Sequence, residues 1–250
     1  MGFTLGWDKS WTKGWDTGFV AKRDSSNPVS GGLQAWYDFS NANYLTLSAT
    51  AITQALDRSG NGNHTAVQGT GTARPTFSTN QLNGLPTATF DGGDTLAPPA
   101  ALYAITNGDS TVFAVSKINA ETAARHNVLY LANGASGTYT LRYAITASRI
   151  EFQSNTDFSV NTLNGITSTS YQLFTATHNA ASLLVHIHNG ANGAGGVGAN
   201  TTSDRMYIGS RQGSAEFLTG GIGELLIYNR ALTTVEATQV ETYLGNKWGL

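Results

Sequence analysis

Short apolar segments alternate with clusters of turn-forming residues along most of the chain. Thr111–Lys117 has the alternating pattern of a half-buried strand, and Ile222–Tyr228 is β-branched, aromatic or apolar at most positions. Similar patterns predict further strands at Leu33–Phe39, Leu85–Phe90, Val128–Ala132, Thr138–Ala144, Ile150–Gln153, Tyr171–His178, Leu183–His188 and Met206–Gly209. Strands about ten residues apart with turns between them predict an all-β fold, an antiparallel β-sandwich of the jelly-roll type.

Glycine, asparagine and aspartate mark the turns between these strands. Asp57–Asn63 and Asp91–Asp94 contain residues that readily take a positive φ, and Asn179–Ala181 is the turn of a predicted hairpin. Gly190–Gly198 is rich in glycine, but it has neither the Lys-Ser/Thr ending of a phosphate-binding loop nor a predicted helix after it. We therefore expect Gly190–Gly198 to be a loop at the rim of the sandwich.

One short C-terminal helix is predicted after the last strand. Thr233 and Glu236 have the spacing of a capping box, in which each side chain binds the backbone of the other residue. Gly245 is the predicted left-handed end of this helix. An apolar stripe at helical spacing is formed by Val235, Val240, Tyr243 and Leu244.

Residues 1–30 differ from the rest of the chain and are predicted to form an irregular N-terminal arm. Gly6, Gly14 and Gly18 disfavour an isolated helix there. The arm carries large aromatic side chains that need a surface to bury them, namely Phe3, Trp7, Trp11, Trp15 and Phe19. Two interpretations stay open: the arm docks on another protein, or it folds back over its own sheet. We divide the chain into an anchoring arm, residues 1–30, and one domain, residues 31–250.

The amino-acid composition limits the classes of partner that the protein is expected to bind. Charged residues are 12% of the chain and the net charge is −2, with no basic block, which argues against nucleic acid as a partner. The absence of cysteine excludes disulfides and thiolate metal sites. No apolar run is long enough to cross a membrane, and the N-terminus lacks the pattern of a secretory signal. We expect no membrane partner and synthesis in a cytoplasm without a signal peptide.

Four segments follow one another in the order seen in laminin-G-like domains: Leu33–Asp38, Asp57–Asn63, Arg74-Pro75 and Asn83–Gly92. The chain from Leu33 to Leu250, which closes with Gly221–Leu232, therefore resembles this family of concanavalin A-like lectin/glucanase jelly rolls. The resemblance implies two antiparallel sheets packed face to face, with loops at the rims. Such domains in bacterial and phage proteins commonly bind glycans or form part of a virion surface. The resemblance therefore also implies one of these two roles. Fold alone does not settle function.

Acidic residues are the first candidates for chemistry. A glycosidase of this superfamily needs two carboxylates that flank the scissile bond, which usually occupy alternate positions of one strand. Glu224 and Glu151 are each alone on their predicted strands, so we expect no catalytic residues and no enzyme. Asp91, Asp94 and Asn61 are candidate oxygen ligands for calcium, although their spacing matches no known calcium loop. No other cofactor is expected.

A sugar-binding site needs an exposed aromatic face for stacking and polar partners for hydroxyl groups. The candidate carbohydrate-binding residues are Tyr139, Arg142, Tyr143, His186, His188 and Asn189. The two histidines share a strand face and have the chemistry of metal ligands, but no third ligand is evident and no metal site is predicted. Ordinary exposed sheet residues are the alternative interpretation for all six.

The leading hypothesis is a non-enzymatic structural protein of a bacteriophage virion, such as a capsid decoration, a fibre or a tail-associated subunit. Its arm docks on other virion proteins, and its lectin-like domain is displayed at the virion surface, with host surface glycans as a further partner. We expect a homo-oligomer. The alternatives are a free carbohydrate-binding lectin and a glycan depolymerase, which would require an acid pair that the sequence does not reveal.

Overall fold

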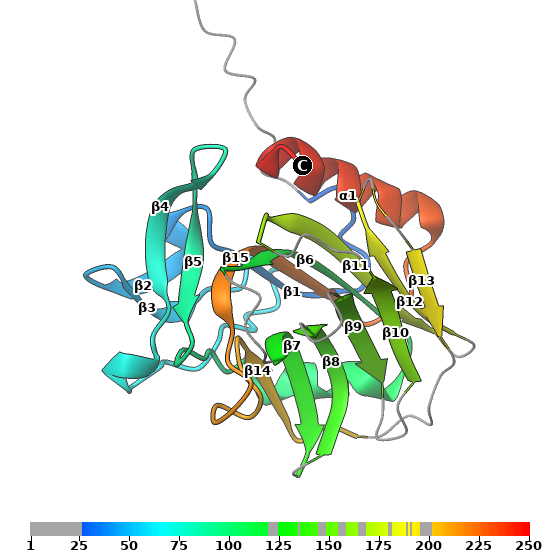
Figure 1. Ribbon diagram of the computed structural model, residues 1–250, viewed down its shortest axis with the longest axis horizontal. Coiled ribbons are helices and arrows are strands. Elements are labelled where there is room, and N and C mark those ends of the chain that lie inside the picture. Colours follow the sequence, from blue (N-terminus) through cyan, green and yellow to red (C-terminus); the bar gives the residue numbers. More distant parts are fainter. Residues whose placement is uncertain are drawn as a thin grey trace, which may run out of the picture.

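A computed structural model of the protein (Figure 1) describes residues 27–119, 125–134, 136–144, 149–154, 159–164, 169–179, 182–188, 190, 192–195 and 202–250. Outside these described residues lie the predicted docking aromatics of the arm and one predicted carbohydrate-binding residue, namely Phe3, Trp7, Trp11, Trp15, Phe19 and Asn189.

Two antiparallel sheets make up most of the described part of the chain (Figure 1). The larger sheet has the order β13-β12-β11-β6-β15-β5-β4-β3-β2, and β1 also pairs with β15. Its strands are β1 (Leu33–Asp38), β2 (Leu45–Ser48), β3 (Ala51–Ala55), β4 (Thr76–Leu82), β5 (Leu85–Asp91), β6 (Ser110–Ile118), β11 (Gln172–Asn179), β12 (Ser182–Ile187), β13 (Asn192–Gly195) and β15 (Thr219–Tyr228). The smaller sheet, in the order β10-β9-β8-β7-β14, contains β7 (Arg125–Asn133), β8 (Ser136–Ala144), β9 (Arg149–Ser154), β10 (Ser159–Asn164) and β14 (Arg205–Ile208).

The main hydrophobic core lies between the two sheets. Side chains alternate across each strand, so Val112 and Ala114 of β6 belong to this core, whereas Phe113 and Val115 belong to a second cluster on the opposite face. Strand β6 is therefore buried on both faces. In the connections that the structure describes, three 3-10 helices lie at Ala42–Tyr44, Gly71–Ala73 and Ala100–Asn107. The predicted all-β antiparallel sandwich is confirmed.

Helix α1 (Thr234–Trp248) covers the outer face of the larger sheet beside β11 (Figure 1). Thr233 and Glu236 form the predicted capping box at its start. The second apolar cluster joins the helix to the sheet and includes Trp36, Phe113, Val115, Leu226, Val240, Tyr243, Leu244 and Trp248. The helix thus adds a third layer over part of the sandwich. Among the described residues, no helix is long and apolar enough to span a lipid bilayer.

The end of α1 differs from the prediction. Gly245 lies inside the helix, which continues to Trp248 and is capped by Gly249 with a φ of 69°. A Cβ on Gly245 would lie 3.1 Å from Nε2 of His188, so glycine at this position lets the helix approach the sheet closely. Val235 also does not belong to the buried stripe, because it is 68% exposed.

Five strands of the described chain were not predicted, namely β2, β3, β4, β10 and β13. Strand β4 is exposed or half-buried throughout, so it lacks the alternation that marks a half-buried strand. Strand β13 lies in the predicted rim loop Gly190–Gly198, and its backbone pairs with β12. Such strands are specified by their pairing partners more than by their own side chains.

The Asp57–Asn63 turn is tied to strand β1 by its own side chains. Oδ1 of Asp57 accepts a hydrogen bond from the backbone N–H of Trp36 at 2.9 Å. Nδ2 of Asn61 donates to the carbonyl of Leu33 at 2.7 Å. The guanidinium of Arg58 stacks 3.8 Å from the ring centroid of Trp36. The turn therefore has a structural role in holding β1.

The domain begins before residue 31. Nδ2 of Asn27 donates to the hydroxyl of Tyr228 at 2.8 Å, and that hydroxyl donates to the carbonyl of Val29 at 2.9 Å. Val29 is buried in the cluster beneath α1. Residues 27–30 therefore pack with the domain.

Candidate functional site

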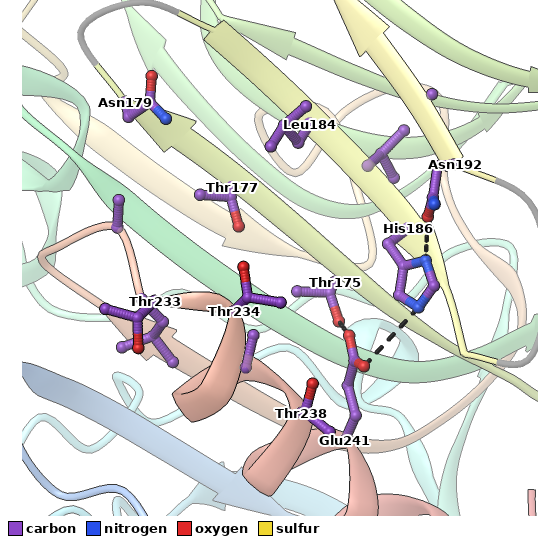
Figure 2. A pocket seen from close by; sticks show the side chains of 15 residues that line it. Thr175, Thr177, Asn179, Leu184, His186, Asn192, Thr233, Thr234, Thr238 and Glu241 are labelled. Carbon is purple, nitrogen blue, oxygen red and sulfur yellow. Dashed lines mark hydrogen bonds and ion pairs between the residues drawn. The ribbon is translucent and has the colours of Figure 1, made fainter.

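A groove of about 660 Å³ lies between α1 and the outer face of the larger sheet. The first turns of α1 form one wall, and strands β11, β12 and β13 form the other (Figure 2). Its polar lining consists of Thr175, Thr177, Asn179, His186, Asn192, Thr233, Thr234, Thr238 and Glu241. The volume falls in the range of small-molecule sites, roughly 300–1,000 Å³.

Strand alternation places the sheet side chains in the groove. On β12, Leu183 and Val185 belong to the core between the sheets, so Leu184 and His186 point to the outer face. Leu184 is 42% exposed, which is unusual for a large apolar side chain in this protein. The groove therefore offers an apolar contact beside polar groups.

Glu241 supplies the carboxylate of the groove. The residue is 8% exposed, and Oε1 accepts a hydrogen bond from the hydroxyl of Thr175. Oε2 lies 3.7 Å from Nε2 of His186 and 4.0 Å from Nδ1 of His188. Nδ1 of His186 is hydrogen-bonded to the side-chain oxygen of Asn192 (Figure 2). The 3.7 Å between Oε2 and Nε2 of His186 is longer than a hydrogen bond, so both atoms can bind a ligand.

Three threonine hydroxyl groups of the groove have no hydrogen-bond partner in the described part of the chain: Thr177, Thr234 and Thr238. The last two come from α1 and the first from β11, so they lie on both walls (Figure 2). Each hydroxyl can donate one hydrogen bond and accept others. A polar ligand can therefore replace the water at these groups without breaking an internal hydrogen bond.

Tyr139 and Tyr143 were predicted to bind carbohydrate, and this prediction is wrong because each is only 1% exposed. Both belong to the core between the sheets. Tyr139 packs edge-on against Phe152 at 4.8 Å between ring centroids, and Tyr143 against Phe174 at 5.6 Å. Burial raises the pKa of both hydroxyl groups.

Arg142 is not available to a sugar either, contrary to the prediction. It is 6% exposed, and Nε donates to Oε2 of Glu151 at 2.7 Å. Nη1 lies 3.8 Å from Oε2 of Glu216. The two carboxylates neutralise the guanidinium. Glu151, which is alone on its strand, thus has a partner on the neighbouring strand.

His186 is the predicted sugar-binding residue that lines the groove, and His188 lies beside it. Their neighbour Glu241 was missed by the sequence analysis because only tertiary packing brings α1 to β12. A signal was present, since Glu241 follows Val240 within the face of the helix that also contains Leu244. A carboxylate at the edge of a buried helix face has a partner or a ligand.

The candidate calcium ligands are hydrogen-bonded to other groups of the protein. Oδ2 of Asp94 accepts from the backbone N–H of Asp91 at 2.8 Å, and Oδ1 of Asp91 accepts from Gly93 N–H at 2.9 Å. Asn61 is bonded to β1. Over the described ranges, no group of three or more histidine and acidic side chains is placed to hold a metal ion.

Replacing Asp94 by asparagine is expected to stabilise the protein above a pH of about 6. Asp94 is 3% exposed, and burial raises its pKa to about 6. A carboxyl group whose folded pKa exceeds its unfolded pKa weakens the fold as it ionises, so the gain should reach about 2–3 kcal/mol and vanish below a pH of about 4. Chemical denaturation at several pH values measures it. Asp109→Asn, at an exposed residue, is the control, and a gain for Asp94→Asn that does not change with pH would contradict the assignment.

Glu224 is enclosed beneath α1. It accepts hydrogen bonds from the indole Nε1 of Trp36 at 2.5 Å and of Trp248 at 2.8 Å, and from Nζ of Lys247 at 2.7 Å. The same Nζ lies 2.7 Å from Oδ2 of Asp38. Glu224, which is the single acidic residue of its strand, belongs to a buried ionic cluster. The cluster ties the last turn of α1 to strands β1 and β15.

The chain belongs to the concanavalin A-like lectin/glucanases superfamily, because the family model Laminin_G_3 matches residues 90–238. No curated protein sequence matches the chain.

Solved structures with the same fold include Trypanosoma rangeli sialidase in complex with sialic acid, with a TM-score of 0.60 at 14% identity over 89% of this chain and 34% of that chain. The receptor-binding domain of botulinum neurotoxin C/D mosaic serotype has a TM-score of 0.60 at 13% identity, over 87% of this chain and 52% of that chain. The binding domain of botulinum neurotoxin DC in complex with SialylT has a TM-score of 0.58 at 12% identity over 86% and 52%. The chain thus spans about a third of the sialidase and about half of the toxin chains. At these identities, the likeness establishes a lectin-like β-sandwich fold and no activity.

Proposed function

We propose that the protein is a non-enzymatic, glycan-binding structural protein of a bacteriophage virion. The groove between α1 and β11–β13 carries the binding part of this proposal, because it combines unpartnered hydroxyl groups, a carboxylate and an exposed leucine. Saccharides present both hydroxyl groups and apolar C–H faces, which match this lining. Membership of a lectin superfamily supports the same function.

The arm supports the structural part of the proposal. Three tryptophans, Trp7, Trp11 and Trp15, recur at a spacing of four residues, and Phe3 and Phe19 flank them. Buried aromatic side chains are the usual anchors of protein interfaces. The arm docks on a capsid, tail or fibre protein, the domain is displayed at the virion surface, and the displayed unit is a homo-oligomer.

Deleting residues 1–26 is expected to abolish incorporation into virions and to leave glycan binding unchanged. Residues 27–30 are kept because Asn27 and Val29 pack against the domain. Mass spectrometry of purified particles measures incorporation, and a glycan array measures binding by the purified protein. Alanine at Trp7, Trp11 and Trp15 together should reproduce the deletion.

The possible outcomes test separately the docking on virions, the glycan binding and the absence of enzymatic activity. Normal incorporation of the truncated protein would contradict docking through the arm, and absence of the full chain from virions together with glycan binding would mean that the protein is a free lectin. Binding of no glycan by the full chain would contradict the lectin function, and release of reducing ends from a bound glycan would contradict a non-enzymatic role.

A further inference from the structure

We propose that the groove beside α1 binds an uncharged saccharide through two adjacent hydroxyl groups, which donate to Glu241 and His186. The inference rests on the proposed glycan-binding function and adds to it the place of the site and the class of ligand. The ligand class differs from the acidic sugar named with the solved sialidase structure.

The charge of the groove selects against acidic sugars. Among the described residues that line it, Glu241 carries a carboxylate and none is a lysine or an arginine. A sugar carboxylate in the groove would face Glu241 with no guanidinium or ammonium group to pair with it. Proteins bind carboxylates with such cations, most often through arginine. An uncharged ligand avoids this repulsion.

Two hydrogen-bond acceptors face each other at the polar end of the groove. Nδ1 of His186 is bonded to the side-chain oxygen of Asn192; because an amide oxygen accepts, this contact assigns a ring proton to Nδ1, and in that tautomer Nε2 has a free lone pair. Oε2 of Glu241, 3.7 Å away, is also an acceptor. Two acceptors cannot bond each other, which accounts for their separation.

Vicinal hydroxyl groups of a pyranose fit this pair of acceptors. Their oxygens are roughly 3 Å apart, so one O–H can donate to each acceptor at ordinary hydrogen-bond length. Buried acceptors gain most from such donors, because Glu241 is 8% exposed and water reaches it poorly. Hydroxyl pairs of this kind are present in neutral hexoses.

The remaining walls match the rest of a sugar ring. Leu184 offers an exposed apolar surface against which the C–H face of a pyranose can pack. The hydroxyls of Thr177 and Thr238 lie on opposite walls and have no partner within the described residues. They are free to bind the other hydroxyl groups of the ligand.

The test uses the full chain on an array of neutral oligosaccharides, each printed beside its sialylated form, with lactose and 3′-sialyllactose as the pair for titration. The neutral member is expected to bind at least about tenfold more tightly, the effect of one well-placed charge interaction. Glu241→Gln should weaken neutral-sugar binding about tenfold. This variant keeps an acceptor for the hydroxyl of Thr175, so the fold is retained.

Two threonine variants test the groove without removing an internal hydrogen bond. Thr177→Val and Thr238→Val are isosteric, and each should weaken binding about threefold without changing the melting temperature. Thr79→Val on strand β4, an exposed threonine outside the groove, is the matched control. Leu184→Ala should also weaken binding, with Val67→Ala, at a 65% exposed residue, as its control.

The possible outcomes test separately the position of the site, the class of ligand and the glycan-binding function. Weaker neutral-sugar binding in the groove variants, with unchanged controls, supports it. Sugar binding that is unaffected by every groove variant would overturn the assignment of the site and leave the lectin function standing. Tighter binding of the sialylated members would overturn the ligand class. Binding of no array member by the full chain would overturn the inference together with the proposed function.

Discussion

The Lys247→Ala variant is expected to be less stable than the wild type by about 3–5 kcal/mol, the cost of removing one partner from a buried ion pair. Nζ of Lys247 lies 2.7 Å from carboxylate oxygens of both Glu224 and Asp38. These carboxylates are 0% and 2% exposed, so water cannot replace the lysine. Asp38 keeps Arg58, whereas Glu224 would keep only neutral donors.

Denaturant unfolding with a circular dichroism readout measures this loss. Lys117→Ala is the matched control, since Lys117 is half-buried and makes a cation–π contact at 5.0 Å with one tyrosine ring. Burial and the nearby Asp38 raise the pKa of Glu224. The loss should therefore shrink at acidic pH, where the unpaired carboxyl takes up a proton. Equal midpoints for Lys247→Ala and Lys117→Ala would show that the cluster does not hold the helix.

The Gly220→Ala variant is expected to yield no folded protein, or to lose more than about 4 kcal/mol, a loss that marks severe overpacking. Gly220 lies in β15, the central strand that pairs with β5, β6 and β1. A Cβ there would overlap the backbone carbonyl oxygen of Lys117 and lie 2.8 Å from Cα of Ile118. Both atoms belong to the backbone of β6, which cannot shift without breaking the sheet.

The control for this substitution is Gly108→Ala. Gly108 has extended backbone geometry, and a Cβ there would meet no atom within 4 Å. Its stability should change by less than about 1 kcal/mol. Thermal unfolding and the yield of soluble protein compare the two variants, and a Gly220→Ala protein as stable as the control would contradict the packing of β15 on β6.

Structural features that depend only on the local sequence were predicted correctly. Thr233 and Glu236 form a capping box because the two side chains need only each other. The hairpin of β11 and β12 also occurs as predicted, with His178 opposite Leu183. The family resemblance supplied the rest of the architecture, and residues 90–238 carry it in the family model.

The sequence predicts poorly which face of a strand is buried, and with it the role of the residues on that face. Tyr139 and Tyr143 were assigned to a surface because alternation predicts a strand without showing which face is buried. Glu241 and Glu224 acquire partners from elements far along the chain, on β12 and at the end of α1. Their partners are set by tertiary packing, which the spacing of residues within one helix or strand does not identify.

The groove has a wall that the sandwich alone does not provide. Helix α1 forms that wall, and the buried cluster at Lys247 fastens the other end of the same helix. A helix that lifts from the sheet would therefore abolish the groove, and a ligand in the groove would hold the helix down. Ligand affinity and helix docking are thus linked equilibria. Substitutions at the buried C-terminal end of α1, around Lys247, can therefore change the affinity for a ligand without contacting that ligand.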